Sequence, residues 1–128
     1  MSVETRNIES VLDLSTAMEN LDGDAELLQE VVEIFLEMGP ELLDELEAAV
    51  AAREVSDVDH LAHSLKGSAS NFCAVKFVAT AYEMEHLAKG GSLVGVEQLM
   101  QRLRDDFQAL LDIQEAIDWS TVSSSWNG

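Results

Sequence analysis

The chain of 128 residues has the size of one domain, and its 47% hydrophobic and 25% charged residues are typical of a folded globular protein. Seven Lys and Arg against 25 Asp and Glu give a formal net charge of −18, which argues against binding to nucleic acids or to anionic membranes. The first residues lack the apolar core of a signal peptide, and no apolar run approaches the roughly 20 residues that span a bilayer. We therefore expect a cytoplasmic protein, and the charge favours a monomer. The initiating Met favours a free-standing chain over a piece of a larger hybrid kinase, and the sequence leaves both open.

Helical periodicity begins near the first cluster of acidic residues. The acidic residues of Asp22-Gly23-Asp24 can cap a helix that we expect over about 24–38, followed by a second segment over about 41–53. A kink should separate them at Gly39-Pro40, because proline lacks an amide donor and clashes with the preceding turn. The apolar stripe of the two segments comprises Leu28, Val31, Phe35, Met38, Leu42, Leu46 and Ala49.

Three further helices are predicted in the second half of the chain. One covers about 57–72 with Ser56 as its N-cap, the next covers about 75–89 and ends at the glycine pair 90–91, and the last begins at Ser92. Their expected core positions are Leu61, Leu65, Phe72, Phe77, Ala81, Met84, Ala88, Val96, Leu99, Leu103, Phe107, Leu110 and Ile117.

The arrangement of these elements predicts one all-α domain. Because the connections are only a few residues long, residues 22–117 should form an antiparallel up-and-down four-helix bundle. Residues 1–21 should add a short helix around Ser15–Asn20 that covers one end. The Ser-rich tail 118–128 is expected to fray, with Trp119 as its one candidate for packing.

The helix over 57–72 carries the most informative residues. At about 100° per residue, His63 points about 160° away from Leu61 and Leu65, so it should face solvent. Lys66 lies about 60° round from it, and Gly67 about 40°. A glycine inside a helix costs about 1 kcal/mol relative to alanine, which indicates that a neighbouring helix or, on an exposed face, another protein approaches its backbone.

An exposed imidazole beside an ammonium and a bare surface suits a nucleophile that carries a phosphoryl group, with the cation offsetting the charge. His60 shares this face, and periodicity alone leaves it open as the reactive histidine. Reflecting position 63 across a turn near 73–74 places Glu85 beside His63. The chain has no glycine-rich nucleotide cradle, so it should be no kinase and must receive its phosphoryl group from another protein.

The stretch Ala62-His63-Ser64-Leu65-Lys66-Gly67-Ser68-Ala69 resembles the A-H-x-L-K-G-S-A signature of histidine-containing phosphotransfer (Hpt) domains. The similarity extends over roughly residues 22–115 and includes Met84-Glu85. Two features near the site depart from the family pattern. Cys73 stands where the family usually has glycine, and Glu85 would repel a phosphorylated histidine unless it contacts the other ring nitrogen.

The resemblance implies a phosphorelay intermediate that exchanges a phosphoryl group between His63 and the aspartate of a response-regulator receiver domain. It implies that Lys66 contacts the phosphoryl oxygens and that Glu85 orients His63. Gly67, Ser70 and His60 would form the partner-binding surface. The protein would need no cofactor of its own, since Mg²⁺ is expected in the receiver, and a histidine kinase or hybrid kinase would be the other partner.

Two other functions remain open on the sequence. The chain could be an Hpt-like module that docks on a receiver or kinase without carrying phosphate, or an acidic carrier of the acyl-carrier type, although the Asp-Ser-Leu attachment motif is missing. A metal site built from His60, His63 and His86 is not expected, because no pair has i,i+4 spacing. We expect Lys76 and Lys89 to be plain surface charges, and Cys73 to be a small buried side chain.

Overall fold

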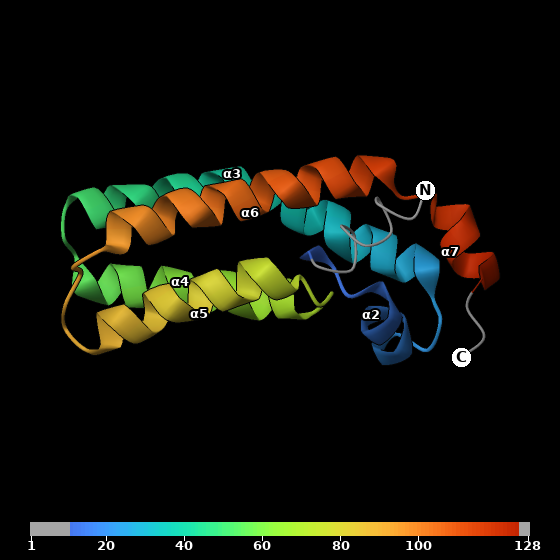
Figure 1. The fold of residues 1–128 in the computed structure, drawn as a ribbon, viewed down its shortest axis with the longest axis horizontal. Coiled ribbons are helices and arrows are strands. Elements are labelled where there is room, and N and C mark those ends of the chain that lie inside the picture. The colour runs from blue at the N-terminus through green and yellow to red at the C-terminus, as the bar shows by residue number, and fades with distance from the viewer. Residues whose placement is uncertain (1–10, 126–128) are drawn as a thin grey trace.

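The computed structural model describes residues 11–125, which over that range form helices and no strand. The helices are α2 (Leu14–Asn20), α3 (Ala25–Ala51), α4 (Val55–Ser70), α5 (Val75–Lys89), α6 (Val96–Ala116) and α7 (Trp119–Ser125). Figure 1 shows α3 beside α6 and α4 beside α5, with the short helices α2 and α7 at one end. The all-α prediction is confirmed, and none of the described helices is long and apolar enough to cross a membrane.

The region around Pro40 differs from the prediction. The expected segments 24–38 and 41–53 are one continuous helix, α3, with Pro40 inside it. The backbone cost of the proline is local, whereas core residues lie on both sides of it, Leu36 before and Leu43 after. Burial of these side chains keeps the two halves in one helix.

The buried face of α3 is also turned relative to the predicted stripe. Leu28, Phe35, Leu46 and Ala49 are buried as expected, but Met38 is 56% exposed. The buried residues that were not predicted are Ala25, Val32, Leu36, Gly39, Leu43 and Val50. Helix α3 contacts α4 and α6 and also the short helices α2 and α7. Several neighbours, which a single stripe does not reveal, therefore decide which side is covered.

The helix α4 begins at Val55 with Glu54 at its N-cap, so the predicted cap at Ser56 is wrong. Its buried positions are Val58, Ala62, Leu65 and Ala69, while Leu61 is only partly buried. Helix α5 has the predicted bounds, and its four predicted core residues are all buried. Helix α6 begins at Val96 and not at Ser92, because Gly95 precedes it in the left-handed conformation, with φ of 85°.

The short terminal helices were predicted with mixed success. Helix α2 forms where the sequence indicated, but residues 119–125 are helical and not frayed. Asp118 begins α7 by accepting hydrogen bonds from the backbone N–H groups of Ser120 and Thr121, at 3.2 and 3.4 Å. Trp119 packs on the core as expected. The predictions for 1–10 and 126–128 lie outside the described residues.

Four phenylalanines join the helices at the centre of the core. The ring of Phe35 on α3 lies 5.2 Å from that of Phe72, 5.3 Å from that of Phe77 and 5.9 Å from that of Phe107. Edge-to-face and tilted ring pairs of this kind each contribute about 0.5–1.5 kcal/mol beyond the area they bury. The cluster therefore ties α3 and α6 to the turn between α4 and α5.

That turn depends on Cys73, which adopts a left-handed conformation with φ of 59°. The Ala74 N–H donates to the Ala69 carbonyl at 3.2 Å, closing the end of α4, and the Asp13 N–H donates to the Cys73 carbonyl at 3.0 Å. A non-glycine residue in this conformation costs about 1–2 kcal/mol. The hydrogen bonds, and not the preference of cysteine for this conformation, therefore stabilise the turn. The Cys73 side chain is partly buried, and not fully buried as predicted.

Gly39 offers a test of the packing between α3 and α6. A Cβ atom built on Gly39 would lie 2.3 Å from Cε1 of Phe107, whose ring is fixed by its aromatic neighbours. We predict that Gly39→Ala lowers the free energy of unfolding by about 1–3 kcal/mol, as overpacked cores do. Urea denaturation measures this loss. The control is Gly67→Ala, where the added Cβ meets no atom within 4 Å, and an equal loss in both variants would refute the packing argument.

Candidate functional site

The site is organised around the carboxylate of Glu85, which lies on α5 and is only 3% exposed. Its Oε2 lies 2.7 Å from Nδ1 of His63, and its Oε1 accepts a hydrogen bond of 2.7 Å from Nζ of Lys66. Both partners lie on α4, one turn apart. The hairpin geometry that predicted Glu85 beside His63 is therefore found in the structure.

Glu85 is ionised in this setting. The hydrogen bond from Lys66 lowers its pKa most, burial opposes that shift, and the hydrogen bond from His63 lowers it further, to about 2. An ionised carboxylate can only accept hydrogen bonds, so this contact favours the form of the ring that carries a proton on Nδ1. In the neutral imidazole the other nitrogen, Nε2, then holds the free lone pair.

His63 combines this fixed orientation with access to solvent. Its side chain is 65% exposed although one of its nitrogens contacts a buried carboxylate. The predicted outward direction of His63 is confirmed. The imidazole is therefore held by a buried group while most of its side chain faces solvent.

Lys66 is held more tightly than an ordinary surface lysine. Its side chain is 24% exposed, and its ammonium lies 5.4 Å from the centre of the Tyr82 ring as well as against Glu85. Only one of the three ammonium donors is used by Glu85 in the contacts described. The cation is therefore positioned beside the imidazole with donors to spare.

The remaining predicted residues lie around His63 without touching Glu85. Gly67 is exposed, and open space surrounds the position of its absent Cβ, so no neighbouring helix explains this glycine. Ser70 is exposed and its hydroxyl donates to the Lys66 carbonyl at 2.8 Å. His60 is exposed on the side of α4 that faces α3, where it lines a shallow groove with Ala48. The bare surface therefore lies on α4 next to the imidazole.

Three residues of the site escaped the sequence analysis. Nζ of Lys89 lies 3.6 Å from Oε2 of Glu85 and 3.4 Å from Oδ1 of Asp59, so Lys89 is more than a plain surface charge. The ring of Tyr82 contacts Lys66 and stacks on that of His86, with 6.1 Å between the ring centres. The i,i+4 spacing of Lys89 and i,i−3 spacing of Tyr82 relative to Glu85 were signals that could have found both. Asp59 has no such signal, because it lies on another helix.

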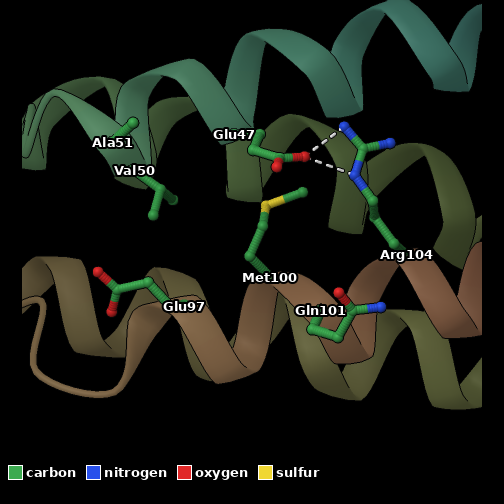
Figure 2. A pocket seen from close by; sticks show the side chains of 7 residues that line it. All are labelled: Glu47, Val50, Ala51, Glu97, Met100, Gln101 and Arg104. Atoms are coloured by element: carbon green, nitrogen blue, oxygen red, sulfur yellow. Dashed lines mark hydrogen bonds and ion pairs between the residues drawn. The ribbon is translucent and has the colours of Figure 1, made fainter.

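A separate pocket of about 310 Å³ lies between α3 and α6. Figure 2 shows Arg104 reaching from α6 to Glu47 on α3, with Val50 and Met100 also lining the space. Arg104 donates hydrogen bonds to Glu47 at 2.6 Å and to Asp44 at 2.8 Å. The lining of this pocket includes none of the predicted site residues. We interpret the ion pairs of Arg104 with Glu47 and Asp44 as a link between α3 and α6. Across the described residues, no group of three or more His, Cys, Asp or Glu is arranged to hold a metal ion.

An exposed histidine on a helical domain, with Nδ1 against a buried carboxylate and a lysine on the same carboxylate, agrees with the class of protein that the sequence resemblance implied, the histidine phosphotransfer domain. The family model of the Hpt domain matches residues 30–113, and the chain therefore belongs to the Hpt domain family. The resemblance seen in the A-H-x-L-K-G-S-A stretch is thereby confirmed.

A solved structure supports the same fold. The chain is similar to histidine-containing phosphotransfer protein B (HptB) from Pseudomonas aeruginosa PAO1, with a TM-score of 0.72 and 22% sequence identity. The alignment covers 91% of this chain and 97% of that protein. At this identity the likeness shows the fold. A comparison with curated proteins gave no match.

The ionised state of Glu85 predicts a specific pH dependence. The pKa of Glu85 is lowered from 4.5 in the unfolded chain to about 2 in the folded protein. The contribution of the ionised carboxylate to the free energy of unfolding is therefore complete above pH 4.5 and is lost as the pH falls from about 4.5 towards 2. We predict that Glu85→Gln is less stable than the unmodified protein at pH 7 and that this difference shrinks over that range. Urea denaturation at several pH values measures it. A difference that is constant with pH would contradict the ionised assignment.

Proposed function

We propose that this protein is a phosphorelay intermediate in which Nε2 of His63 accepts a phosphoryl group from the aspartate of a response-regulator receiver domain and returns it to such an aspartate. The observation that carries the proposal is the 2.7 Å contact between Nδ1 of His63 and the buried carboxylate of Glu85. This contact fixes the ring, assigns the proton to Nδ1 and leaves Nε2 as the nucleophile on an exposed side chain.

In the proposed transfer step, every bond that forms or breaks involves His63 or the aspartyl phosphate of the receiver domain. The lone pair of Nε2 attacks phosphorus, the bond between phosphorus and the aspartyl oxygen breaks, and the aspartate leaves with that electron pair. The imidazole keeps its Nδ1 proton and becomes positively charged, next to the negative charge of Glu85. No proton has to leave the ring, so the same contact serves the reverse transfer.

We assign Lys66 to the stabilisation of the phosphoryl oxygens. Its ammonium is held beside the ring by Glu85 and Tyr82, which supports this role because a preorganised cation needs little rearrangement as charge develops. The protein needs no cofactor of its own under this proposal. The divalent ion of the transfer, Mg²⁺, belongs to the receiver domain.

The partner surface is proposed to surround His63 on α4. Gly67, Ser70 and His60 are all exposed there, and the open space at Gly67 supports a close approach of another protein's backbone. The receiver domain is one partner, and a histidine kinase or hybrid kinase is the source of the phosphoryl group upstream. We also propose a cytoplasmic location and a monomeric state. The net charge of −18, which discourages self-association, supports the monomer.

We further propose that α3–α6 constitute an antiparallel up-and-down four-helix bundle. Contacts of α4 with both α3 and α5, and of α6 with both α5 and α3, support a closed ring of four neighbours. In Figure 1 each connection between successive long helices joins two ends that lie at the same side of the molecule. Such a bundle gives α4 a solvent-facing side along its whole length, which the proposed docking requires.

The acceptor assignment is tested by transfer from a radiolabelled receiver domain with Mg²⁺, using the receivers of the same organism as donors. We predict that the protein becomes labelled, that His63→Gln abolishes the label, and that the matched control His60→Gln keeps it. Label that persists in His63→Gln and disappears in His60→Gln would move the acceptor to His60. A folded protein that binds receivers but takes up no label from any of them would favour the docking module instead.

The bare surface predicts an unusual pair of effects for Gly67→Ala. Replacing a helical glycine by alanine where space is open should raise the free energy of unfolding by about 0.5–1 kcal/mol. We predict that the same variant slows transfer from the receiver, because the added methyl group lies in the proposed interface. Denaturation curves and transfer rates measure the two effects, and an unchanged rate would remove Gly67 from the partner surface.

A further inference from the structure

The second lysine near the site contacts the oxygen of Glu85 that also binds the reactive histidine. Oε2 lies 2.7 Å from Nδ1 of His63 and 3.6 Å from Nζ of Lys89, whereas Oε1 faces Lys66. The lysine and the imidazole therefore share one carboxylate oxygen. The electrostatic attraction between the ammonium of Lys89 and that oxygen weakens the oxygen as a hydrogen-bond acceptor for the Nδ1 proton.

Lys89 is itself held between two acids on different helices. Its ammonium lies 3.4 Å from Oδ1 of Asp59 on α4 and 3.6 Å from Glu85 on its own helix, and its side chain is 59% exposed. With His63 neutral, the charges of Asp59 and Glu85 are balanced by those of Lys66 and Lys89. Both acids attract the same ammonium group. The attraction of Lys89 to Asp59 therefore limits how closely Lys89 approaches Glu85 and how strongly it interacts with that carboxylate.

We propose that Lys89, restrained by Asp59, is a positioning residue that limits how strongly Glu85 binds the Nδ1 proton of His63 and so sets the ratio of the two neutral imidazole tautomers. This inference rests on the proposed function of His63. Only the tautomer with the proton on Nδ1 leaves Nε2 free to attack phosphorus. The fraction of that tautomer therefore scales the transfer rate, and the Asp59–Lys89 pair acts on the rate through Glu85 without touching the phosphoryl group.

The tautomer ratio can be measured without any partner. Nitrogen-15 NMR of the labelled protein near pH 8.5, about two units above the ordinary pKa of a histidine, distinguishes protonated from bare Nδ1 and Nε2. The His63 signals are identified by their loss in His63→Gln. We expect Lys89→Met to raise the ratio of the Nδ1–H to the Nε2–H tautomer about two- to fivefold, the range expected for an exposed ion pair. The matched control is Lys76→Met, which removes an exposed lysine elsewhere on α5 and should leave the ratio unchanged.

A double-mutant cycle separates the proposed route from a direct effect of charge. Asp59→Asn should lower the ratio, because Lys89 is then free to settle on Glu85, and it should have no effect once Lys89 is methionine. If Asp59 acted directly on His63, its substitution would lower the ratio equally in both backgrounds. That additive result, or an unchanged ratio in Lys89→Met, would overturn the inference.

Transfer rates connect the measurement to function. With a labelled receiver domain as donor, the rate should rise in Lys89→Met and fall in Asp59→Asn by the same factors as the Nδ1–H fraction. An Nδ1–H fraction that shifts while the rate stays constant would overturn the positioning role. A failure of the proposed function would be seen in a different measurement. The unmodified protein would then take up no label on His63, whatever its tautomer ratio.

Discussion

A buried carboxylate that must be ionised constrains both the packing and the chemistry of this protein. Glu85 is almost fully covered, and burying an unpaired negative charge is costly, so its oxygens need donors from the neighbouring helix. His63 and Lys66 are those donors, each at 2.7 Å. These contacts join α4 to α5, and one of them also orients the imidazole of His63. Under the proposed function, the same atoms contribute to stability and to reactivity.

The rest of the fold keeps these three side chains in register. His63 and Glu85 are 22 residues apart, and the turn that reverses the chain between them contains Cys73 in a left-handed conformation. The phenylalanine cluster anchors this turn to α3 and α6, since Phe72 and Phe77 lie on its two sides and both contact Phe35. Small buried residues on α4, Ala62 and Ala69, allow the two helices to approach closely. The exposed side of α4 is thereby left free for a partner.

Local signals predicted much of this arrangement correctly. The bounds of α5 follow from its apolar spacing and its terminal glycine, and the outward direction of His63 follows from counting residues around a helix. The predictions failed where a helix has more than one neighbour or where a terminus packs on the core. Met38 was assigned to the core because it continues a stripe, yet the contacts of α3 with α4 and α6 leave it exposed. Residues 119–125 were expected to fray because their Ser-rich composition carries no sign of the cap at Asp118 or of the packing of Trp119.

The sequence by itself determined that the chain is helical, that a histidine, a lysine and a glycine share one exposed helix face, and that this stretch resembles the Hpt signature. These are properties of periodicity and of residue order, which are local and can be read along the chain. Only the tertiary structure decided which imidazole nitrogen faces Glu85, that Lys66 is held by Glu85 and Tyr82, and that Lys89 lies between Glu85 and Asp59. Those facts depend on distances between helices of a few ångströms, which are set by how all the side chains between them pack.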